Sequence, residues 1–205
     1  GENTITEKVG DLTFTISANS FYQVNSDQMK VLYDKVVDYA ALTGKETVLD
    51  LYCGVGTIGL YCSNMAKEVI GIESVKAAVL DANRNAVING IVNTRFICGN
   101  AEEELPKLLA PISEDADSEN LSAIKIKGAD VVILDPPRNG CAEKLLEAVV
   151  KASPERIVYV SCNAATLARD VKYLGENGYE FMEATSVDMF PWTGHVETVV
   201  LMSRK

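Results

Sequence analysis

Residues 48–59, VLDLYCGVGTIG, place a glycine-rich turn directly between an apolar run and a stretch with helical character. In an α/β sheet a ligand binds at such a turn, beyond the carboxyl end of the strand, because glycines let the backbone approach and helix N–H groups face the ligand. The spacing Gly54-x-Gly56-x-x-Gly59 is also typical of dinucleotide dehydrogenases. The stretch therefore predicts a strand, a ligand-binding turn and a helix, and leaves the ligand open.

The rest of the chain alternates short apolar runs with amphipathic stretches, which indicates an α/β fold. Near-continuous apolar runs such as residues 131–134, VVIL, indicate a sheet that helices cover on both faces. We therefore predict a doubly wound, Rossmann-like, mostly parallel seven-stranded sheet preceded by a small β-hairpin. Strands are expected at residues 47–52, 68–73, 94–99, 130–135, 156–161, 179–187 and 196–202. Helices are expected at residues 27–41, 56–66, 75–89, 101–109, 142–151 and 164–177, and the hairpin at residues 5–8 and 12–16.

Length and composition favour one globular unit. With 205 residues, 47% of them hydrophobic, the chain is long enough for one well-buried domain and too short for two. We assign residues 1–25 to the hairpin and a lead-in segment, and residues 26–205 to the main domain. No apolar run is long enough to cross a bilayer and the N-terminus lacks the features of a signal peptide, so we expect a cytoplasmic monomer that contacts no membrane. The polar, initially acidic residues 111–128 are interpreted as a surface loop, an insertion without function.

Charge and cysteine content exclude two classes of protein. The formal net charge of -10 argues against a protein that binds nucleic acid through its own basic surface. The five cysteines include no C-x-x-C pair and form no disulfide framework. We therefore expect reduced thiols and no metal or iron–sulfur site.

Polar residues follow the first three predicted strands of the sheet. Asp50 precedes the first glycine by four residues, where a carboxylate can bind the ammonium of a methionine moiety but would repel a pyrophosphate. Glu73 ends the second strand and is placed to accept hydrogen bonds from ribose hydroxyls, although NAD enzymes use an acid there as well. Asn100 follows the third strand and can read an adenine edge. Alternatively, Asn100 is a helix N-cap and Asp50 caps the end of its strand.

Two further strand ends carry reactive groups. Asp135-Pro136-Pro137-Arg138 follows the fourth strand and Ser161-Cys162-Asn163 follows the fifth, so both point to one cleft. Cys162 lies where an apolar strand meets the N-terminus of a predicted helix, an environment that lowers the pKa of a thiol and presents a nucleophile. Buried cysteines are usually small hydrophobic residues, which is our interpretation of Cys62 and Cys98.

Five motifs occur in order along the chain: FYQVN (residues 21–25), DLYCGVGTIGL (50–60), DPPRNG (135–140), SCNAATLARD (161–170) and DMFPWTGHVE (188–197). In this order they resemble the motifs of bacterial RNA 5-methyluridine methyltransferases, from about Ser20 to the C-terminus. The resemblance implies that residues 26–205 form the catalytic domain of an enzyme that transfers a methyl group from S-adenosyl-L-methionine to C5 of a uridine in RNA, with S-adenosylhomocysteine as product. SCNAATLARD and DMFP favour the ribosomal RNA branch, with a 23S-type RNA as substrate, over the transfer RNA branch.

The resemblance also implies roles for individual residues. Cys162 becomes the nucleophile, Glu197 the proton-abstracting base and Asp135 a further catalytic residue. Attack of the Cys162 thiolate on C6 of uracil turns the weakly nucleophilic C5 into an enolate carbon that can accept the methyl group, and Glu197 then removes the C5 proton so that the thiolate leaves. The expected S-adenosylmethionine contacts are Gln23, Tyr52, Glu73, Asn100 and Asp135, beside the turn with Asp50, Gly54 and Gly56.

The chain departs from the family pattern at Ala164 and Trp192. Proline commonly follows Ser-Cys-Asn in the family, so Ala164 should loosen the start of its helix. Trp192 stands where the family has a polar residue or histidine; it can stack on an extruded base, but we favour packing under its loop. His195, the sole histidine, is interpreted as shaping the turn, because the resemblance gives the proton to Glu197.

Other functions stay open at this point. The family usually carries an N-terminal oligonucleotide-binding barrel, which does not precede Ser20, so we expect an RNA-binding domain elsewhere in a longer parent chain. One alternative is a methyltransferase that acts on cytosine C5 or on an exocyclic amine, and an amine acceptor needs no thiol. Another is a cofactor-binding module that is inactive on its own. A nicotinamide dehydrogenase is the third.

Overall fold

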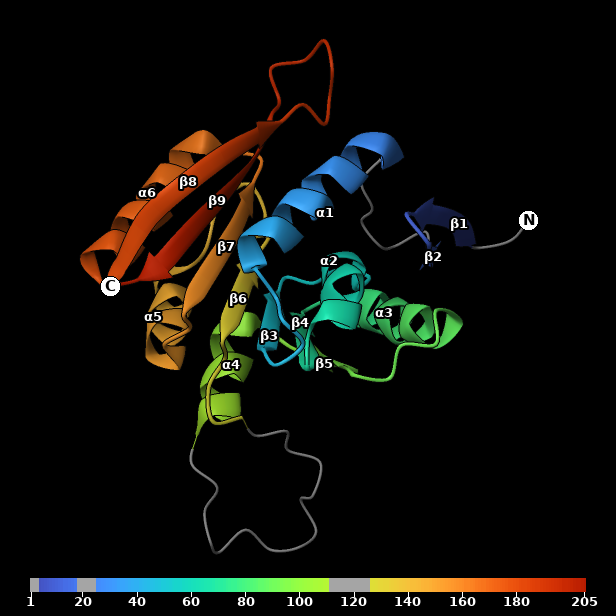
Figure 1. The fold of residues 1–205 in the computed structure, drawn as a ribbon, viewed down its shortest axis with the longest axis horizontal. Coiled ribbons are helices and arrows are strands. Elements are labelled where there is room, and N and C mark those ends of the chain that lie inside the picture. Colours follow the sequence, from blue (N-terminus) through green and yellow to red (C-terminus); the bar gives the residue numbers. More distant parts are fainter. Residues whose placement is uncertain (1–3, 18–24, 111–125) are drawn as a thin grey trace, which may run out of the picture.

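A seven-stranded sheet runs through the centre of the computed structural model, which describes residues 4–17, 25–110 and 126–205 (Figure 1). The strands lie in the order β5-β4-β3-β6-β7-β9-β8, and β9 runs antiparallel to both of its neighbours. The strands are β3 (Thr47–Leu51), β4 (Glu68–Glu73), β5 (Thr94–Cys98), β6 (Val131–Leu134), β7 (Arg156–Ser161), β8 (Tyr179–Val187) and β9 (Glu197–Arg204). The sheet is therefore mostly parallel and doubly wound, as predicted.

Six helices cover the two faces of this sheet (Figure 1). One face packs against α1 (Ser26–Ala40), α2 (Thr57–Cys62) and α3 (Lys76–Ile88). The other packs against α4 (Ala101–Leu109), α5 (Glu143–Ala152) and α6 (Ala164–Glu176). Because successive strand residues point to opposite faces, Val131 and Ile133 join the first core and Val132 and Leu134 the second. This double burial explains why the central strands read as continuous apolar runs.

The hairpin of β1 (Thr4–Val9) and β2 (Leu12–Ser17) forms a separate two-stranded sheet. The backbone of β2 is held against α3 by hydrogen bonds from its outward-facing amides to side-chain oxygens. The donors are the amides of Thr13, Thr15 and Ser17, and the acceptors are Asn89, Asn85 and Asp81 in that order, at 2.7–2.9 Å. Two residues along a strand advance about 6.6 Å and four along a helix about 6 Å, so the two series stay in register. The outer edge of the hairpin is thereby satisfied without another strand.

The predicted elements agree with the structure, with small differences at their ends. The expected bounds of β4, β7, β8 and α4 are those observed. The helix expected at residues 56–66 is a short α-helix followed by a 3-10 turn, Ser63–Met65. Most of the loop predicted at residues 111–128 lies outside the described residues. Within the described ranges, none of the helices combines the length and apolar composition that crossing a bilayer requires.

Candidate active site

A cavity of about 580 Å³ opens at the carboxyl ends of the parallel strands. It lies where the chain order reverses between β3 and β6, the position at which open α/β sheets bind ligands. The residues predicted for the site that line it are Asp50, Tyr52, Gly54, Glu73, Asp135, Cys162 and Glu197. Gly56 and Asn100 do not line this cavity, and Gln23 lies outside the described residues.

The glycine turn forms one wall of the cavity through an unusual backbone path. Tyr52 takes a left-handed conformation with φ of 65°, which is strained for a bulky residue, and its amide donates to the Ile72 carbonyl at 3.0 Å. Gly56 has φ of 81°, and a Cβ there would lie 2.9 Å from Phe96 Cζ. Gly56 is therefore required for the shape of the turn, although it does not face the cavity.

Asp50 is a fully buried carboxylate at the end of β3. Its Oδ2 accepts the Gly59 amide at 2.9 Å, whereas Oδ1 has no hydrogen-bond partner among the described residues. Burial, with the charge of Glu73 adding to it, raises the pKa of Asp50 to about 7. A buried oxygen without a partner in a cavity wall is suited to a cationic ligand group, because such a group would satisfy the hydrogen bond and favour ionisation.

Glu73 links the glycine turn to the start of α3. Its Oε2 accepts the Gly54 amide at 3.1 Å and its Oε1 accepts the Val75 amide at 2.7 Å. Ser74 Oγ also donates to Oε1, at 3.2 Å, and Glu73 lines the cavity. Glu73 is thus held in a fixed orientation beside the turn.

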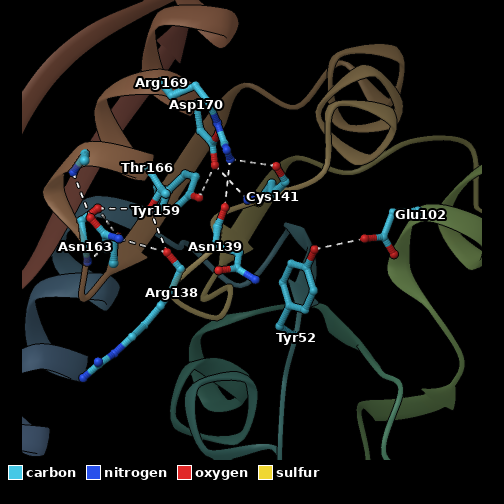
Figure 2. A network of polar contacts seen from close by, with 12 residues as sticks. Tyr52, Glu102, Arg138, Asn139, Cys141, Tyr159, Asn163, Thr166, Arg169 and Asp170 are labelled. Atoms are coloured by element: carbon cyan, nitrogen blue, oxygen red, sulfur yellow. Dashed lines mark hydrogen bonds and ion pairs between the residues drawn. The ribbon is translucent and has the colours of Figure 1, made fainter.

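Tyr52 and Asn100 differ in how the structure holds them. The Tyr52 hydroxyl donates to Glu102 Oε1 of α4 at 3.3 Å (Figure 2). Asn100 occupies the N-cap position of α4, but its side chain makes no capping hydrogen bond and is exposed. Asn100 is therefore the N-cap residue by position, as the alternative interpretation had it, but its side chain does not cap the helix.

Strand pairing brings Cys162 and Glu197 together. Ser161, the last residue of β7, pairs with Thr198 of the antiparallel strand β9. Cys162 directly follows β7 and Glu197 is the first residue of β9, so the two lie next to the last recorded pair of the ladder, and the charge of Glu197 acts on the Cys162 thiol. Both line the cavity, Glu197 being buried and Cys162 half-buried. This juxtaposition depends on β9 lying between β7 and β8.

The electrostatics of this group correct one expectation. The pKa of the Cys162 thiol is raised, because burial and the charge of Glu197 outweigh the opposing effect of Arg138. Burial likewise raises the pKa of Glu197, against the effect of Arg138. Burial, then the charges of Glu197 and Asp50, raise the pKa of Asp135 to about 8. The predicted lowering of the thiol pKa is therefore wrong for the protein without ligand, and a bound cation would shift all these groups toward ionisation.

A polar network holds the loop that carries Asp135 and Arg138 (Figure 2). Fully buried Asp170 of α6 accepts the Tyr159 hydroxyl at 2.6 Å and the Cys141 amide at 2.8 Å. Arg169 pairs with Asp170 at 2.7 Å and donates to the Cys141 carbonyl at 3.0 Å. The network therefore fixes the far end of the loop to α6.

Two further hydrogen bonds hold the same loop near Arg138. Asn163 Nδ2 and Thr166 Oγ1 both donate to the Arg138 carbonyl, at 3.1 and 3.2 Å. The Arg138 side chain extends away from these contacts in Figure 2, and it lines the cavity. The motif SCNAATLARD thus positions the backbone of the DPPR motif, a function that sequence reasoning missed because each contact joins residues 25 or more apart.

Three expectations about loop and helix ends can be compared with the structure. Ala164 does not delay α6, which begins at Ala164 because Asn163 Oδ1 accepts the Ala165 amide at 3.0 Å. Trp192 is fully exposed, so the predicted packing under the loop is wrong. The His195 amide donates to Thr193 Oγ1 at 3.1 Å, and His195 does not line the cavity.

Sequence reasoning gave no role to several other residues that line the cavity, among them Tyr33, Thr57 and Phe190. The Tyr33 hydroxyl donates to Thr57 Oγ1 at 2.8 Å, so α1 contributes to the wall next to the glycine turn. Phe190 could have been found from its place in DMFP, whereas Tyr33 sits in an ordinary amphipathic helix without a distinguishing signal.

Comparison with known proteins extends over almost the whole chain. The model of the tRNA (uracil-5-)-methyltransferase family matches residues 3–205. An uncharacterized RNA methyltransferase of Halalkalibacterium halodurans is 48% identical over 205 residues, which cover all of this chain and 42% of that protein. One of Caldanaerobacter subterraneus subsp. tengcongensis is 50% identical over 204 residues, again all of this chain and 42% of the relative. The chain therefore spans about two fifths of the length of these relatives.

A solved structure shares the fold closely. The tRNA (uracil-54, C5)-methyltransferase of Pyrococcus abyssi, in complex with S-adenosyl-L-homocysteine, superposes with a TM-score of 0.79 at 37% identity. The match covers 98% of this chain and 45% of the archaeal protein. The fold is therefore the Rossmann-like fold of class I methyltransferases, with an N-terminal hairpin added.

Proposed function

The chain belongs to the tRNA (uracil-5-)-methyltransferase family, and we propose that it is an enzyme that methylates C5 of a uridine in RNA. Its cavity would bind the methyl donor, S-adenosyl-L-methionine. The observation that supports this most is that Cys162 and Glu197 both line the cavity that the glycine turn borders, close enough for the charge of Glu197 to act on the thiol. A thiol and a buried carboxylate on facing strands are what covalent activation of a pyrimidine needs.

The residues around the glycine turn fit a sulfonium amino acid. The unpaired Oδ1 of Asp50 suits its ammonium, and Glu73 suits the ribose hydroxyls. Tyr52, Gly54 and Asp135 complete the binding wall, and Gly56 keeps the turn in shape. Gln23 and Asn100 stay predicted contacts on the strength of the motifs alone. When bound, S-adenosyl-L-methionine supplies the electrophilic methyl carbon.

On the other side of the cavity, we assign one role to each reactive side chain. The Cys162 thiolate bonds to C6 of the uracil, and electron density moves to C5 and the ring carbonyl. After methylation, the Glu197 carboxylate takes the C5 proton, the bond between C6 and sulfur breaks, and the thiolate is released. Asp135, whose pKa is raised by burial and by the charges of Glu197 and Asp50, is the remaining acid of this group, and in its protonated form it donates a hydrogen bond to the negative charge that develops on the uracil carbonyl.

Ribosomal RNA stays the proposed substrate. The residues of the SCNAATLARD and DMFP motifs support a ribosomal RNA substrate, whereas the family name and the archaeal structure concern transfer RNA. The net charge of -10 indicates that phosphate contacts come from elsewhere. We therefore propose that this chain is part of a longer protein whose other segments supply an RNA-binding domain, and that the enzyme acts as a monomer in the cytoplasm.

Ligand stabilisation followed by methyl transfer tests this proposal. S-adenosyl-L-homocysteine should raise the Tm of the chain and NAD should not, since only the former has an ammonium for Asp50. Labelled methyl groups should then appear in 5-methyluridine when ribosomal RNA is supplied, and Cys162→Ala should abolish the transfer. Stabilisation by NAD would support a dehydrogenase, and product on cytidine or on an exocyclic amine would support the other methyltransferases. Stabilisation without transfer, also in the full-length parent enzyme, would indicate a binding module.

A further inference from the structure

A six-residue exposed segment borders the proposed active site on the β8–β9 connection. Residues 191–196 are all exposed, while Phe190 before them and Glu197 after them line the cavity. The connection, red in Figure 1, projects beyond the ends of β8 and β9. Trp192 lies two residues from Phe190, so its Cα is within about 7 Å of a cavity residue. Trp192 does not line the cavity itself, but its backbone lies beside a residue that does, a position called the rim below.

The backbone holds Trp192 in place through a tight turn. The Thr193 amide donates to the Phe190 carbonyl at 3.1 Å, which closes a four-residue turn with Pro191 second and Trp192 third. Trp192 has φ of 71°, the left-handed conformation that the third position of a type II turn requires and that glycine adopts best. Thr193 Oγ1 donates to the same carbonyl at 2.7 Å and accepts the His195 amide at 3.1 Å. A bulky side chain thus occupies a strained, well-anchored position.

The exposure of Trp192 is not explained by packing. A fully exposed indole contributes no buried apolar area, and its backbone conformation is unfavourable for any residue except glycine or asparagine. Strain of this kind is typical of ligand-contacting positions. The indole offers a flat apolar face, which matches the face of a nucleobase. An acidic chain also gains from a contact with RNA that does not depend on phosphate attraction.

We propose that Trp192 is a stacking platform for an unpaired base next to the target nucleotide. This inference rests on the proposed function, because a base arrives at the rim only if its neighbour enters the cavity toward Cys162. Extrusion of the target unstacks its neighbours, and an aromatic face at the rim replaces the lost stacking. Trp192 then contributes to substrate binding and takes no part in the chemical step.

The chain offers a direct spectroscopic test, since Trp192 is its sole tryptophan. We expect a short unpaired uridine-containing RNA to quench the indole emission saturably, and the duplex of the same sequence to leave it unchanged. Binding is followed in parallel by the anisotropy of a labelled RNA. Binding without quenching, or no binding of the unpaired RNA at millimolar concentration, overturns the proposal.

Steady-state methylation of the same RNA separates stacking from structure. Trp192→Ala should raise the KM for RNA about 10-fold with an unchanged kcat, and Trp192→Phe should restore most of it. Phe181→Ala is the matched control, because Phe181 is also exposed but lies on β8 about 20 Å along the strand from the connection.

An unchanged KM in Trp192→Ala contradicts the proposal while leaving the proposed function intact. Loss of methylation in the unmodified enzyme, with S-adenosylmethionine bound, contradicts the proposed function instead. If the parent protein covers Trp192 with another domain, its emission will not respond to RNA, which also contradicts the stacking role.

Discussion

The two walls of the cavity are built in different ways. The wall of β3 and β4 owes its shape to backbone conformation, with Tyr52 and Gly56 in left-handed regions and Glu73 accepting a turn amide. The wall of β6, β7 and β9 owes its shape to strand register and to hydrogen bonds that hold the DPPR loop. These hydrogen bonds come from the N-cap of α6, Asn163, and from Asp170 within the helix. The first wall is assigned to the cofactor and the second to the uridine, and Asp135, directly after β6, is assigned a contact with each.

This difference predicts that the two functions can be damaged separately. Changes in the backbone wall should weaken cofactor binding, and changes in the wall built from side chains should slow the chemical step while the cofactor still binds.

Glu197→Gln should lower the rate of methyl transfer by about 10³-fold, because the amide cannot accept the C5 proton. The methylated RNA should accumulate as a covalent adduct on Cys162, visible on a denaturing gel. Cofactor binding should not change. The matched control is Glu180→Gln on β8, which is exposed and should behave as the unmodified enzyme. Normal turnover in Glu197→Gln would remove the carboxylate from the mechanism.

Asp170→Asn should lower kcat about 10-fold or more and reduce the free energy of unfolding by about 2 kcal/mol, since a buried acceptor of two hydrogen bonds is weakened. Its affinity for S-adenosyl-L-homocysteine should stay close to normal, because Asp170 supports the opposite wall. Calorimetric titration and chemical denaturation measure the two quantities. Asp38→Asn, at an exposed ion pair, is the control. Equal loss of cofactor affinity would show that the walls are not independent.

Gly56→Ala should destabilise the chain by about 2 kcal/mol and weaken cofactor binding, because the added Cβ meets Phe96 as well as a left-handed backbone. Gly44→Ala shares a positive φ, 89°, but its Cβ meets nothing within 4 Å. That control should lose only about 1 kcal/mol. The difference between the two variants in denaturant unfolding isolates the steric term. No difference would contradict the role given to the Phe96 contact.

Asp50→Asn should stabilise the ligand-free protein while it weakens S-adenosylmethionine binding. The pKa of Asp50 is raised from 3.8 to about 7, so between these values the folded state holds a proton that the unfolded state releases. Stability therefore falls as the pH rises through this window, and asparagine removes the loss. We expect a gain in Tm of about 2–4 °C at pH 8 and less at pH 5, followed by calorimetry. A gain that is independent of pH would argue against a buried ionisable group.

The sequence predicted the backbone wall better than the other wall, for a physical reason. The glycine turn and the strand-end acids Asp50 and Glu73 follow from local periodicity and conformational preference. Glu197 at the start of a strand has no local signal, because its place opposite Cys162 depends on β9 entering the sheet beside β7. Without the family resemblance it would be read as a solvated charge.

Three other failures have the same origin, contacts that only the fold creates. Asp170 lies in an amphipathic helix, where an acid is usually solvated, and only the fold places it against Tyr159 and Cys141. The position of Trp192 depends on a turn closed by hydrogen bonds of Thr193, which composition does not reveal. The thiol of Cys162 was expected to ionise easily from its helix N-terminus, but burial and a facing carboxylate have the larger effect.

Trapping the covalent bond between Cys162 and uracil is the decisive experiment for the proposed mechanism. RNA in which uracil carries fluorine at C5 cannot lose a proton to Glu197, so the bond between Cys162 and C6 should persist after methyl transfer. Peptide mapping of the trapped complex is expected to find the nucleotide on the peptide that contains Cys162, with S-adenosylmethionine required for its accumulation. Active methylation of normal RNA together with no adduct, or an adduct on any of the other four cysteines, would contradict the account.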